Sequence, residues 1–350
     1  MRAPGGCALA VVLVTYENAG RVGGTLRAVL AQLQAGDELV VVDNGSRDGT
    51  VDVVREAAPL ARVLEQERNL GFAAGCNLGA AVSTAPLLLF LNPDATPAPG
   101  ALEALRGAAG DRPRWGAWQA LVTLPGGRDI NTSGGVTHFL GMGWAGSWGQ
   151  PIGTAPDGPT EVSFASGAAL VVRRAAWDHV GGFDERYFMY GEDLDLALRL
   201  WLSGFGVGLV PAAHVEHDYE FAKGERKWLL LERNRWWTVL SDYPAGLLIP
   251  LLPALLGAEA ALLLVAARGG WLRAKLRAQA AVLRELPQIL ARRREVQARR
   301  TVGARRLAEQ LSASLDSAYL SGTAGMPRLA ALQRAYWVAV RALLRLGSPP

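Results

Sequence analysis

ALAVVLVT at residues 8–15, ELVVVD at 38–43 and PLLLFLN at 86–92 are near-continuous apolar runs. Runs of this kind predict strands that are buried on both faces of a parallel sheet. The segments between them have helical spacing or the length of a short strand, giving helices at 23–33, 50–58 and 71–82 and a strand at 61–64. This alternation predicts a doubly wound α/β sheet, in which ligands bind beyond the carboxyl ends of the strands.

The rest of the chain divides by composition. Residues 110–165 are rich in Gly, Pro and Trp, which predicts a loop-rich β insertion. Helical spacing returns at 175–180 and 192–203, and GVGLV at 206–210 predicts a strand. We expect two domains, residues 1–240 and 241–350, because the chain beyond 240 is first apolar and then rich in arginine.

Composition limits the class of protein. With 350 residues, of which 50% are hydrophobic and 19% charged, the chain can bury a large core, and it is not a disordered protein. Its two cysteines exclude a disulfide framework and a four-thiolate zinc site. No charged-then-apolar signal pattern opens the sequence, so we expect a cytoplasmic main body.

The formal charge of +4 hides two opposed parts. Residues 268–350 hold 16 Lys+Arg and 4 Asp+Glu, a net +12, so residues 1–267 hold the remaining 20 and 28, a net −8. This asymmetry argues against a uniformly basic nucleic-acid binder. It indicates an acidic globular domain followed by a basic tail with an anionic partner.

The first two strands end in polar residues, namely Thr15, Tyr16, Glu17 and Asn18 after the first and DNGSRDGT at 43–50 after the second. A carboxylate such as Asp43 at a strand end suits hydrogen bonds to a ribose or a base. The alternative is a turn with a helix cap, which the same residue types favour. No glycine-rich phosphate loop follows either strand, so a bound diphosphate would need another positive charge.

The segment NLGFAAGCNLG at 69–79 spaces its glycines four residues apart. Gly71, Gly75 and Gly79 then share one helix face, to which something must come close. Two explanations stay open, which are tight packing on the sheet and the approach of a ligand near Asn69 and Asn77.

The third run leads into Asn92-Pro93-Asp94, whose oxygens suit Mg²⁺ or Mn²⁺ that also holds a diphosphate. Further on, Glu192 and Asp193 are adjacent acids at a helix start, which is an arrangement able to present a general base. Asp195 is spaced to pair with Arg199, four residues on. His214 and His217 lie on opposite faces of a strand, so at most one of them faces a site.

Taken in order, these segments resemble the glycosyltransferases of family 2, of GT-A type, and in particular bacterial rhamnosyltransferase-like members. The resemblance covers roughly residues 8–240 and rests on an ordered set of motifs: VTYEN at 14–18, VVDNGSRDGT at 41–50, NLGFAAGCN at 69–77, FLNPDA at 90–95, GGFDERYFMYGEDLDLALR at 181–199, His217 and ERNRWW at 232–237. It implies a GT-A fold, a Rossmann-like, doubly wound mixed sheet, with a C-terminal helical, membrane-associating extension.

The resemblance also implies roles for single residues. Asp193 matches the general base, with Glu192 and Tyr190 beside it or on the acceptor side. Asp94 and His217 match metal-facing residues for Mg²⁺ or Mn²⁺. The positions that match the nucleotide-sugar pocket are Thr15, Tyr16, Glu17, Asp43, Asn69, Asn77 and Asn92. Two of these depart from the family pattern, since Asn92 replaces the first acid of D-x-D and Glu17 stands where Asn is usual.

The implied activity is inverting transfer of a sugar, rhamnose or another hexose, from a dTDP- or UDP-linked donor to a hydroxyl of a glycan or lipid-linked glycan in cell-surface polysaccharide synthesis. The alternative is a membrane-attached nucleotide-binding or scaffolding protein without turnover. A nucleotidyltransferase is a weaker competitor, because no basic phosphate loop follows the first strand. The tryptophans between Trp115 and Trp148 fit either carbohydrate stacking or loop packing.

Residues 245–267 are long enough for a membrane helix, but two prolines and Glu259 disfavour one that spans. The arginine-rich helices that follow fit a peripheral protein on the inner face of the cell membrane, attracted to anionic lipid. A buried hydrophobic hairpin with a solvated basic face is the other interpretation.

Overall fold

The computed structural model describes residues 7–218, 224–315 and 327–346. By their internal contacts they form two compact units. The first unit groups Met1–Gly135, Ala145–Met189 and Phe205–Tyr219, and the second groups Val136–Trp144, Tyr190–Gly204 and Glu220–Pro350. The domain boundary at residue 240 rests on composition and stays a prediction.

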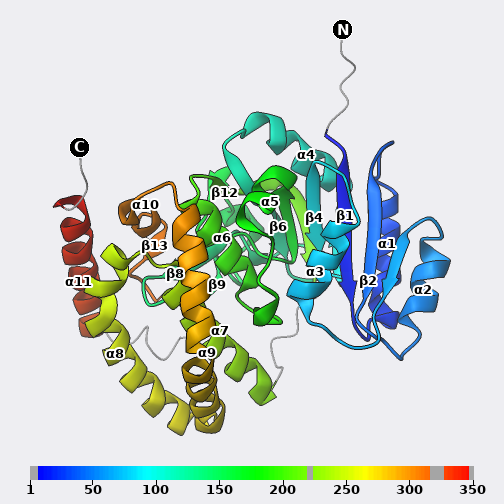
Figure 1. Cartoon of the computed structure of the whole chain (residues 1–350). Helices are drawn as coiled ribbons and strands as arrows, with labels where there is room; N and C mark the ends of the chain where they lie inside the picture. The colour runs from blue at the N-terminus through cyan, green and yellow to red at the C-terminus, as the bar shows by residue number, and fades with distance from the viewer. Residues whose placement is uncertain (1–6, 219–223, 316–326, 347–350) are drawn as a thin grey trace. The chain divides into compact units, whose positions relative to one another are not determined.

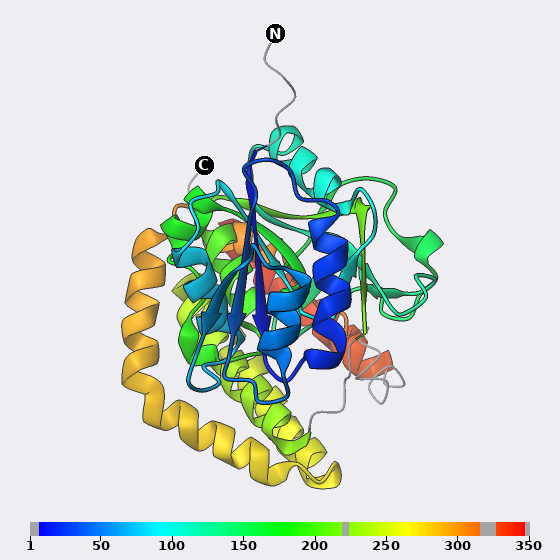
Figure 2. The same ribbon diagram turned by 90° about the vertical axis from the view of Figure 1, so that its right-hand side faces the viewer.

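The first unit is built on a ten-stranded mixed sheet with helices on both faces (Figure 1, Figure 2). Its strands are β1 (Leu9–Thr15), β2 (Glu38–Asp43), β3 (Arg62–Glu65), β4 (Leu87–Leu91), β5 (Ala95–Pro97), β6 (Trp115–Thr123), β7 (Ile130–Thr132), β10 (Thr160–Glu161), β11 (Ala169–Arg173) and β12 (Gly206–His217). Its helices are α1 (Ala19–Leu30), α2 (Thr50–Ala57), α3 (Phe72–Ala81), α4 (Ala101–Asp111) and α5 (Arg174–Val180), with short 3₁₀ turns at Ile152–Thr154 and Glu185–Tyr187.

The strand order is β10-β12-β6-β11-β4-β1-β2-β3, with β5 paired to β12 and β7 to β6. Strands β4, β1, β2 and β3 run parallel, whereas β11 is antiparallel to both β4 and β6. The doubly wound mixed sheet that the apolar runs predict is therefore confirmed. The carboxyl ends of β1, β2 and β4 meet at one edge of this sheet.

Alternate residues of each buried strand serve opposite faces of the sheet. Val11 of β1 belongs to the core that packs under α1, α2 and α4, whereas its neighbours Val12 and Val14 face α3. A Cβ on Gly75 would lie 2.6 Å from Val14, and one on Gly79 would lie 2.3 Å from Val12. Tight packing of α3 on the sheet therefore explains these two glycines, and no ligand is required.

Gly71 has a different role from the one that helix spacing predicts. It precedes α3 with φ of 91°, and a Cβ there would lie 2.4 Å from the carbonyl oxygen of Phe188. The prediction that all three glycines share a helix face is therefore wrong for Gly71, because this residue caps the helix instead of continuing it.

Strand β6 is the main element that the sequence pattern did not predict. All nine residues from Trp115 to Thr123 are buried, and the strand lies between β12 and β11 inside the main sheet. Its polar residue Gln119 is satisfied, since its side-chain amide donates to the Ala120 carbonyl at 2.9 Å and accepts from the Ser166 amide at 2.7 Å. The expected loop-rich insertion thus begins only after residue 123.

The second unit is mainly helical. Its elements are α6 (Glu192–Leu202), α7 (Gly224–Asp242), α8 (Ala245–Arg268), α9 (Leu272–Arg299), α10 (Ala304–Ala308) and α11 (Pro327–Leu346), with the small sheet β13 (Leu311–Ser312), β8 (Gly135–His138) and β9 (Gly143–Ala145). Helices α7 and α9 pack along each other. Among the described residues, α8 is the one helix long and apolar enough to cross a membrane, judged by length and composition.

Buried ion pairs hold the second unit together. Asp195 and Arg199 pair at 2.5 Å within α6, as their spacing predicts, and both side chains are at most 3% exposed. Glu232 and Arg235 of α7, Glu259 of α8 and Lys275 of α9 form a second cluster, in which Lys275 is fully buried. These contacts tie three helices to one another through charge-assisted hydrogen bonds.

Candidate functional site

The ends of β1 and β2 are joined by a buried hydrogen bond. Thr15 and Asp43 are register partners, and the Thr15 hydroxyl donates to an Asp43 oxygen at 2.9 Å. The same carboxylate accepts from the amides of Gly45 and Ser46, at 3.1 and 2.9 Å, and from the Ser46 hydroxyl at 2.6 Å. Asp43, only 3% exposed, therefore shapes the turn that follows β2, as the turn interpretation expects.

Glu17 and Tyr16 lie on the exposed rim beside this turn. Glu17 has φ of 55°, and its carboxylate accepts from the Arg47 amide at 3.0 Å. Asn adopts this left-handed conformation more readily than Glu, which gives a physical reason for Asn being usual here. Tyr16 is 48% exposed, so its ring is accessible to a planar ligand.

Asn69 and Asn77 are both engaged in local structure. The Asn69 side chain accepts from the Gly71 amide at 2.8 Å. The Asn77 amide group donates to the Phe183 carbonyl at 2.9 Å and to Glu185 at 3.0 Å, and it accepts from the Phe183 amide at 3.1 Å. Asn77 therefore holds the loop after α5 against α3, and this structural role accounts for its hydrogen bonds.

Asn92, Asp94 and His217 come together beyond the end of β4. His217 pairs with Ala95 where β12 meets β5, which places its ring beside Asp94. The His217 Nε2 atom lies 3.2 Å from an Asp94 oxygen and 3.2 Å from the Asn92 side-chain nitrogen. His217 is 4% exposed, whereas His214 is exposed, so one histidine of the two faces this site, as the strand spacing predicts.

One charged residue that sequence reasoning missed adjoins Asp94. Arg21 of α1 lies 3.7 Å from Asp94 and 3.4 Å from Asp218. Burial alone would raise the pKa of Asp94, but the hydrogen bond and charge of His217, together with Arg21, hold that pKa below its usual range. Arg21 has no distinguishing sequence context, since it occurs in an ordinary helical pattern.

The donor set at Asp94 and His217 suits a divalent cation. A carboxylate oxygen and an imidazole nitrogen 3.2 Å apart match two neighbouring ligands of one octahedral ion, which lie about 3 Å apart when each is about 2.1 Å from it. Within the described part of the chain, no three His, Cys, Asp or Glu residues gather as a complete metal site. The remaining ligands would come from a bound diphosphate and water, as is usual for Mg²⁺.

The proposed base and its neighbours belong to the second unit. Tyr190 and Gly191 both have positive φ, 70° and 86°, and they lead directly into the first turn of α6. The Tyr190 carbonyl accepts from Asn234 of α7 at 2.7 Å, which fixes this strained entry. Asp193 is half-buried, and one of its oxygens accepts from the Leu194 amide at 2.8 Å.

Glu192 differs sharply from Asp193 in its surroundings. It is 6% exposed, and its Oε2 atom has no hydrogen-bond partner among the described residues. Burial, and then the charge of Asp193, raises the pKa of Glu192 to about 8. Burial and the charge of Glu192 likewise raise the pKa of Tyr190. Glu192 is therefore a neutral acid at pH 7, and it adds no second negative charge beside Asp193.

Glu192 is expected to make stability fall with rising pH. Its pKa is 4.5 in the unfolded chain and about 8 when folded, so between these values only the native state holds the proton. The free energy of unfolding then decreases as pH rises through this window. In Glu192→Gln this loss disappears, so its melting temperature should gain on that of wild type between pH 5 and pH 8 and level off above that range. A difference that stays constant from pH 5 to pH 8 would contradict the buried neutral acid.

The tryptophans of residues 115–148 mostly serve packing. Trp115, Trp118 and Trp144 are 5%, 0% and 8% exposed, and the Trp118 ring nitrogen donates to the Leu105 carbonyl at 3.0 Å. Of the two interpretations of this stretch, packing therefore accounts for these three residues.

Comparison with known proteins gives matches to glycosyltransferases. A family model described as glycosyl transferase family 2 matches residues 10–179, and one described as the N-terminal domain of galactosyltransferase matches residues 156–223. The chain is 35% identical over 242 residues to the N-acetylglucosaminyl-diphospho-decaprenol L-rhamnosyltransferase of Mycobacterium tuberculosis (strain ATCC 25618 / H37Rv), covering 62% of this chain and 78% of that relative.

Two solved structures share the fold. The mannosyltransferase PcManGT from Pyrobaculum calidifontis, in complex with GDP-Man and Mn²⁺, has a TM-score of 0.51 at 20% identity, covering 98% of this chain and 86% of that one. GalNAc-T7 with UDP, GalNAc and Mn²⁺ has a TM-score of 0.54 at 15% identity, covering 69% of this chain and about half, 49%, of that one. These likenesses confirm the GT-A fold that the motifs imply.

Proposed function

Because the chain belongs to glycosyltransferase family 2 and resembles its rhamnosyltransferases, we propose that it transfers a sugar, with inversion, from a nucleotide-diphosphate donor to a hydroxyl of a lipid-linked glycan. The observation that carries this proposal is the pairing of Asp94 with His217 at the carboxyl edge of the sheet. The name of the Mycobacterium tuberculosis relative favours rhamnose as the sugar and a polyprenyl-diphosphate-linked acceptor. The donor is then dTDP- or UDP-linked, and the product enters cell-surface polysaccharide.

Asp94 and His217, with Asn92 beside them, would hold Mg²⁺ or Mn²⁺. Such an ion would stabilise the charge of a departing diphosphate and would supply the positive charge that the missing phosphate loop does not. Arg21, next to Asp94 and 46% exposed in its side chain, adds a second positive charge at the same edge. Mn²⁺ in the two structures of similar fold supports this assignment.

Thr15, Tyr16, Glu17 and Asp43 line the proposed nucleoside pocket. Thr15 and Asp43 are buried and bonded to each other, so they set the shape of the pocket, while the exposed Tyr16 and Glu17 are positioned to contact a base or ribose. Asn69 and Asn77 would support the diphosphate and sugar through the loops that they hold.

Asp193 would act as the general base. It takes the proton of the acceptor hydroxyl while that oxygen forms a bond to the anomeric carbon, and the bond from this carbon to the diphosphate breaks, leaving its electron pair on the departing nucleotide. One displacement of this kind inverts the anomeric centre. The neutral Glu192 leaves its neighbour Asp193 to take the proton, and Tyr190 would face the acceptor.

The experiment that tests the function is a thermal-shift series with nucleotide sugars, with and without Mn²⁺. A ligand at one hundred times its Kd stabilises the folded state by about 2.7 kcal/mol, which is a shift of several degrees. We expect Mn²⁺ to enlarge the shift given by the correct donor. Asp94→Asn should lose the Mn²⁺-dependent part, while the exposed Asp52→Asn keeps it.

Turnover separates the proposed enzyme from a nucleotide-binding scaffold. Donor hydrolysis in the absence of acceptor, measured with Mn²⁺, is expected for the enzyme and absent for the scaffold. A donor that binds equally well with and without metal would contradict the metal assignment. We also propose that the protein works as a peripheral protein on the cytoplasmic face of the cell membrane, since its acceptor is anchored there.

A further inference from the structure

The outward side of α8 carries no charge. Between residues 245 and 267, all of which the structure describes, Glu259 is the only charged residue, and its side chain is 14% exposed. One side of the helix is buried in the second unit through Leu247, Leu251 and Leu255. On the other side, large apolar residues are open to solvent, with Ile249, Leu256 and Leu264 at 64%, 66% and 60% exposed. Exposing so large an apolar surface to water is unfavourable in free energy, so such a surface indicates a binding partner.

Helix α11 extends this apolar surface. It lies beside α8, and the Tyr336 hydroxyl donates to the Pro250 carbonyl. Its inner side packs through Trp337, which stacks on Phe139 with ring centroids 5.2 Å apart. Its outer side exposes Leu332, Val338 and Leu343 at 66%, 67% and 58%. We call the exposed apolar residues of α8 and α11 the apolar face.

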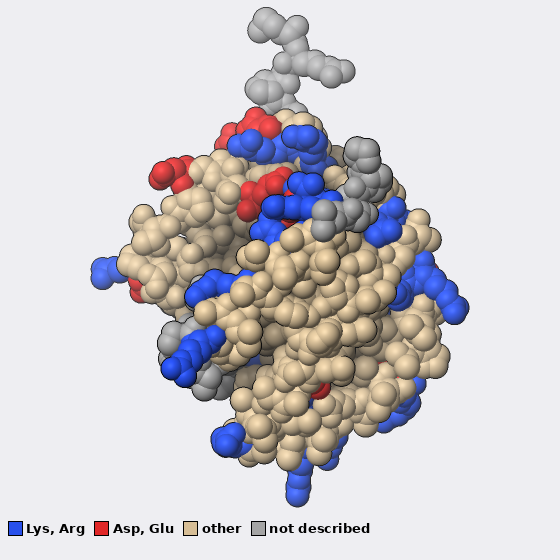
Figure 3. Space-filling view, turned by 90° about the vertical axis from the view of Figure 1, so that its left-hand side faces the viewer, with Lys and Arg blue, Asp and Glu red and all other residues tan. Residues whose placement is uncertain are grey.

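Figure 3 looks onto the side of Figure 1 on which α8 and α11 are drawn. It shows a broad, almost uncharged surface, with Lys and Arg side chains spread around its margin and some Asp and Glu side chains at its upper edge. The sequence of α11 agrees, since residues 328–345 contain four arginines and no acid. A face that is apolar in the middle and basic at the rim matches the two layers of an anionic membrane surface.

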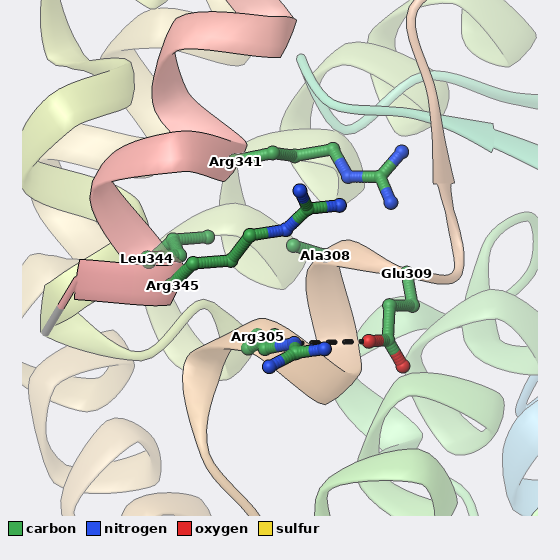
Figure 4. A pocket seen from close by; sticks show the side chains of 6 residues that line it. All are labelled: Arg305, Ala308, Glu309, Arg341, Leu344 and Arg345. Atoms are coloured by element: carbon green, nitrogen blue, oxygen red, sulfur yellow. Dashed lines mark hydrogen bonds and ion pairs between the residues drawn. The ribbon is translucent and has the colours of Figure 1, made fainter. Parts of the chain in front are cut away.

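One part of this rim is a small pocket between α10 and α11. It is lined by Arg305 and Glu309 of α10 and its C-terminal end, and by Arg341, Leu344 and Arg345 of α11 (Figure 4). Glu309 is paired with Arg305 at 3.3 Å, which leaves the two α11 arginines as an excess of positive charge there. Guanidinium groups bind phosphate oxygens in a two-pronged geometry, so Arg341 and Arg345 suit contact with a headgroup phosphate.

Glu259 decides how α8 meets a membrane. Its carboxylate lies 2.6 Å from Arg235 of α7 and 2.6 Å from Lys275 of α9, and Gln279 donates to it at 2.7 Å. These contacts fasten the middle of α8 to the protein along one side. A spanning α8 would either break this cluster or carry Glu259 into hydrocarbon, and both cost several kcal/mol.

We propose that α8 and α11 lie flat in the headgroup region of an anionic phospholipid bilayer, with the apolar face among the acyl chains and Arg341 and Arg345 at headgroup phosphates. This inference rests on the proposed function, because a lipid-linked acceptor is reached at that surface. A second copy of the chain is a poorer occupant, since a two-fold contact would bring two basic rims together.

The first test is co-sedimentation with vesicles, either neutral or containing 30% phosphatidylserine. Ile249→Glu/Leu256→Glu/Leu264→Glu should bind both kinds at least about a hundredfold more weakly than wild type, because three inserted side chains are lost. Leu60→Glu, at a residue 99% exposed in the first unit, is the matched control and should bind normally. Wild-type binding by the triple variant would overturn the proposal.

Arg341→Gln/Arg345→Gln should weaken binding to the anionic vesicles by about thirtyfold, at about one kcal/mol per basic residue, and barely change binding to neutral ones. Equal loss on both vesicle types would contradict the headgroup contact. Circular dichroism and melting temperature, which should match wild type, check that each variant folds.

The second test distinguishes a flat helix from a spanning one. Ala245→Cys and Ala267→Cys, both at exposed positions, place a thiol at either end of α8 in a Cys7→Ser background. On sealed vesicles, an impermeant maleimide should label both thiols at similar rates. Protection of one end would show that α8 spans and would overturn the flat arrangement.

These measurements need no turnover, so they stand apart from the proposed function. If no donor is hydrolysed but vesicle binding depends on the apolar face, the surface is right and the enzyme assignment fails. If the triple variant transfers sugar to a short soluble acceptor yet binds vesicles like wild type, the surface fails alone. If the wild type forms a dimer in the absence of lipid and the triple variant is a monomer, the apolar face serves self-association, and the proposal is overturned.

Discussion

Asp193→Asn is expected to lower sugar transfer by about 10²–10⁴-fold, the usual contribution of a positioned general base. The amide has the size of the carboxylate and keeps an oxygen that can accept from the Leu194 amide, so the start of α6 should stay intact. It cannot take a proton from the acceptor hydroxyl. Donor affinity, measured by calorimetry with Mn²⁺, should therefore stay within about twofold of wild type.

Two further variants make this test specific. Asp178→Asn changes an exposed acid on α5 and should keep full activity. Glu192→Gln should also keep most of the transfer activity at pH 7, because Glu192 is neutral there and the amide reproduces an uncharged side chain. Near-normal turnover in Asp193→Asn would contradict the assignment of Asp193 as the general base. Equal losses of activity in Asp193→Asn and Glu192→Gln would show that the difference in charge does not separate the roles of the two residues.

The strands around the site could be predicted because they are buried on both faces. In β1, β2 and β4 almost every residue is apolar, so the run itself marks the strand and its polar end. Strand β6 is as deeply buried, but it contains Gln119 and lies among glycines and tryptophans. Its place in the sheet depends on pairing with β11 and β12, which are distant in sequence, and no local pattern records such pairing.

The candidate site shows the same division. Strand parity predicted that at most one of His214 and His217 faces the site, because side chains alternate between the faces of a strand, and the family resemblance pointed to His217. Arg21 reaches Asp94 only because α1 lies over the end of the sheet, and its position in the sequence gives no sign of this. Spacing marked Gly75 and Gly79 as close contacts, but only the structure shows that Val14 and Val12 are what they contact.

In the basic tail, composition alone gives a wrong picture of where individual charged residues lie. Counting charges treats all 16 basic residues beyond 267 as a solvated surface, yet Lys275 is fully buried and Arg292 is 8% exposed. Lys275 meets Glu232 and Glu259, which come from the part of the chain with net negative charge. Some of the basic residues beyond 267 therefore pair with acidic residues before it inside the protein, and these pairs join α7, α8 and α9.

Lys275→Met is expected to destabilise the second unit by about 3–5 kcal/mol, the cost of removing one partner from a buried ion pair. Met fills much of the volume of the lysine stem, so the loss is mainly electrostatic. Burial alone would raise the pKa of Glu259, whereas Arg235 and Lys275 keep it below its usual range. Without the lysine, Glu232 and Glu259 share Arg235 alone, which leaves one buried negative charge uncompensated.

Urea unfolding at two pH values separates this cause from a packing defect. At pH 7 the variant should lose the full 3–5 kcal/mol, but near pH 5 the deficit should shrink, because a carboxylate that has lost its partner protonates more easily and the unpaired charge disappears. Arg273→Met, two residues before Lys275 on the same helix and exposed, is the matched control and should change stability by less than about 0.5 kcal/mol. An equal loss of stability at both pH values would mean that Lys275 stabilises the helices by its packing. Adding Glu232→Gln to Lys275→Met would then restore none of the lost stability.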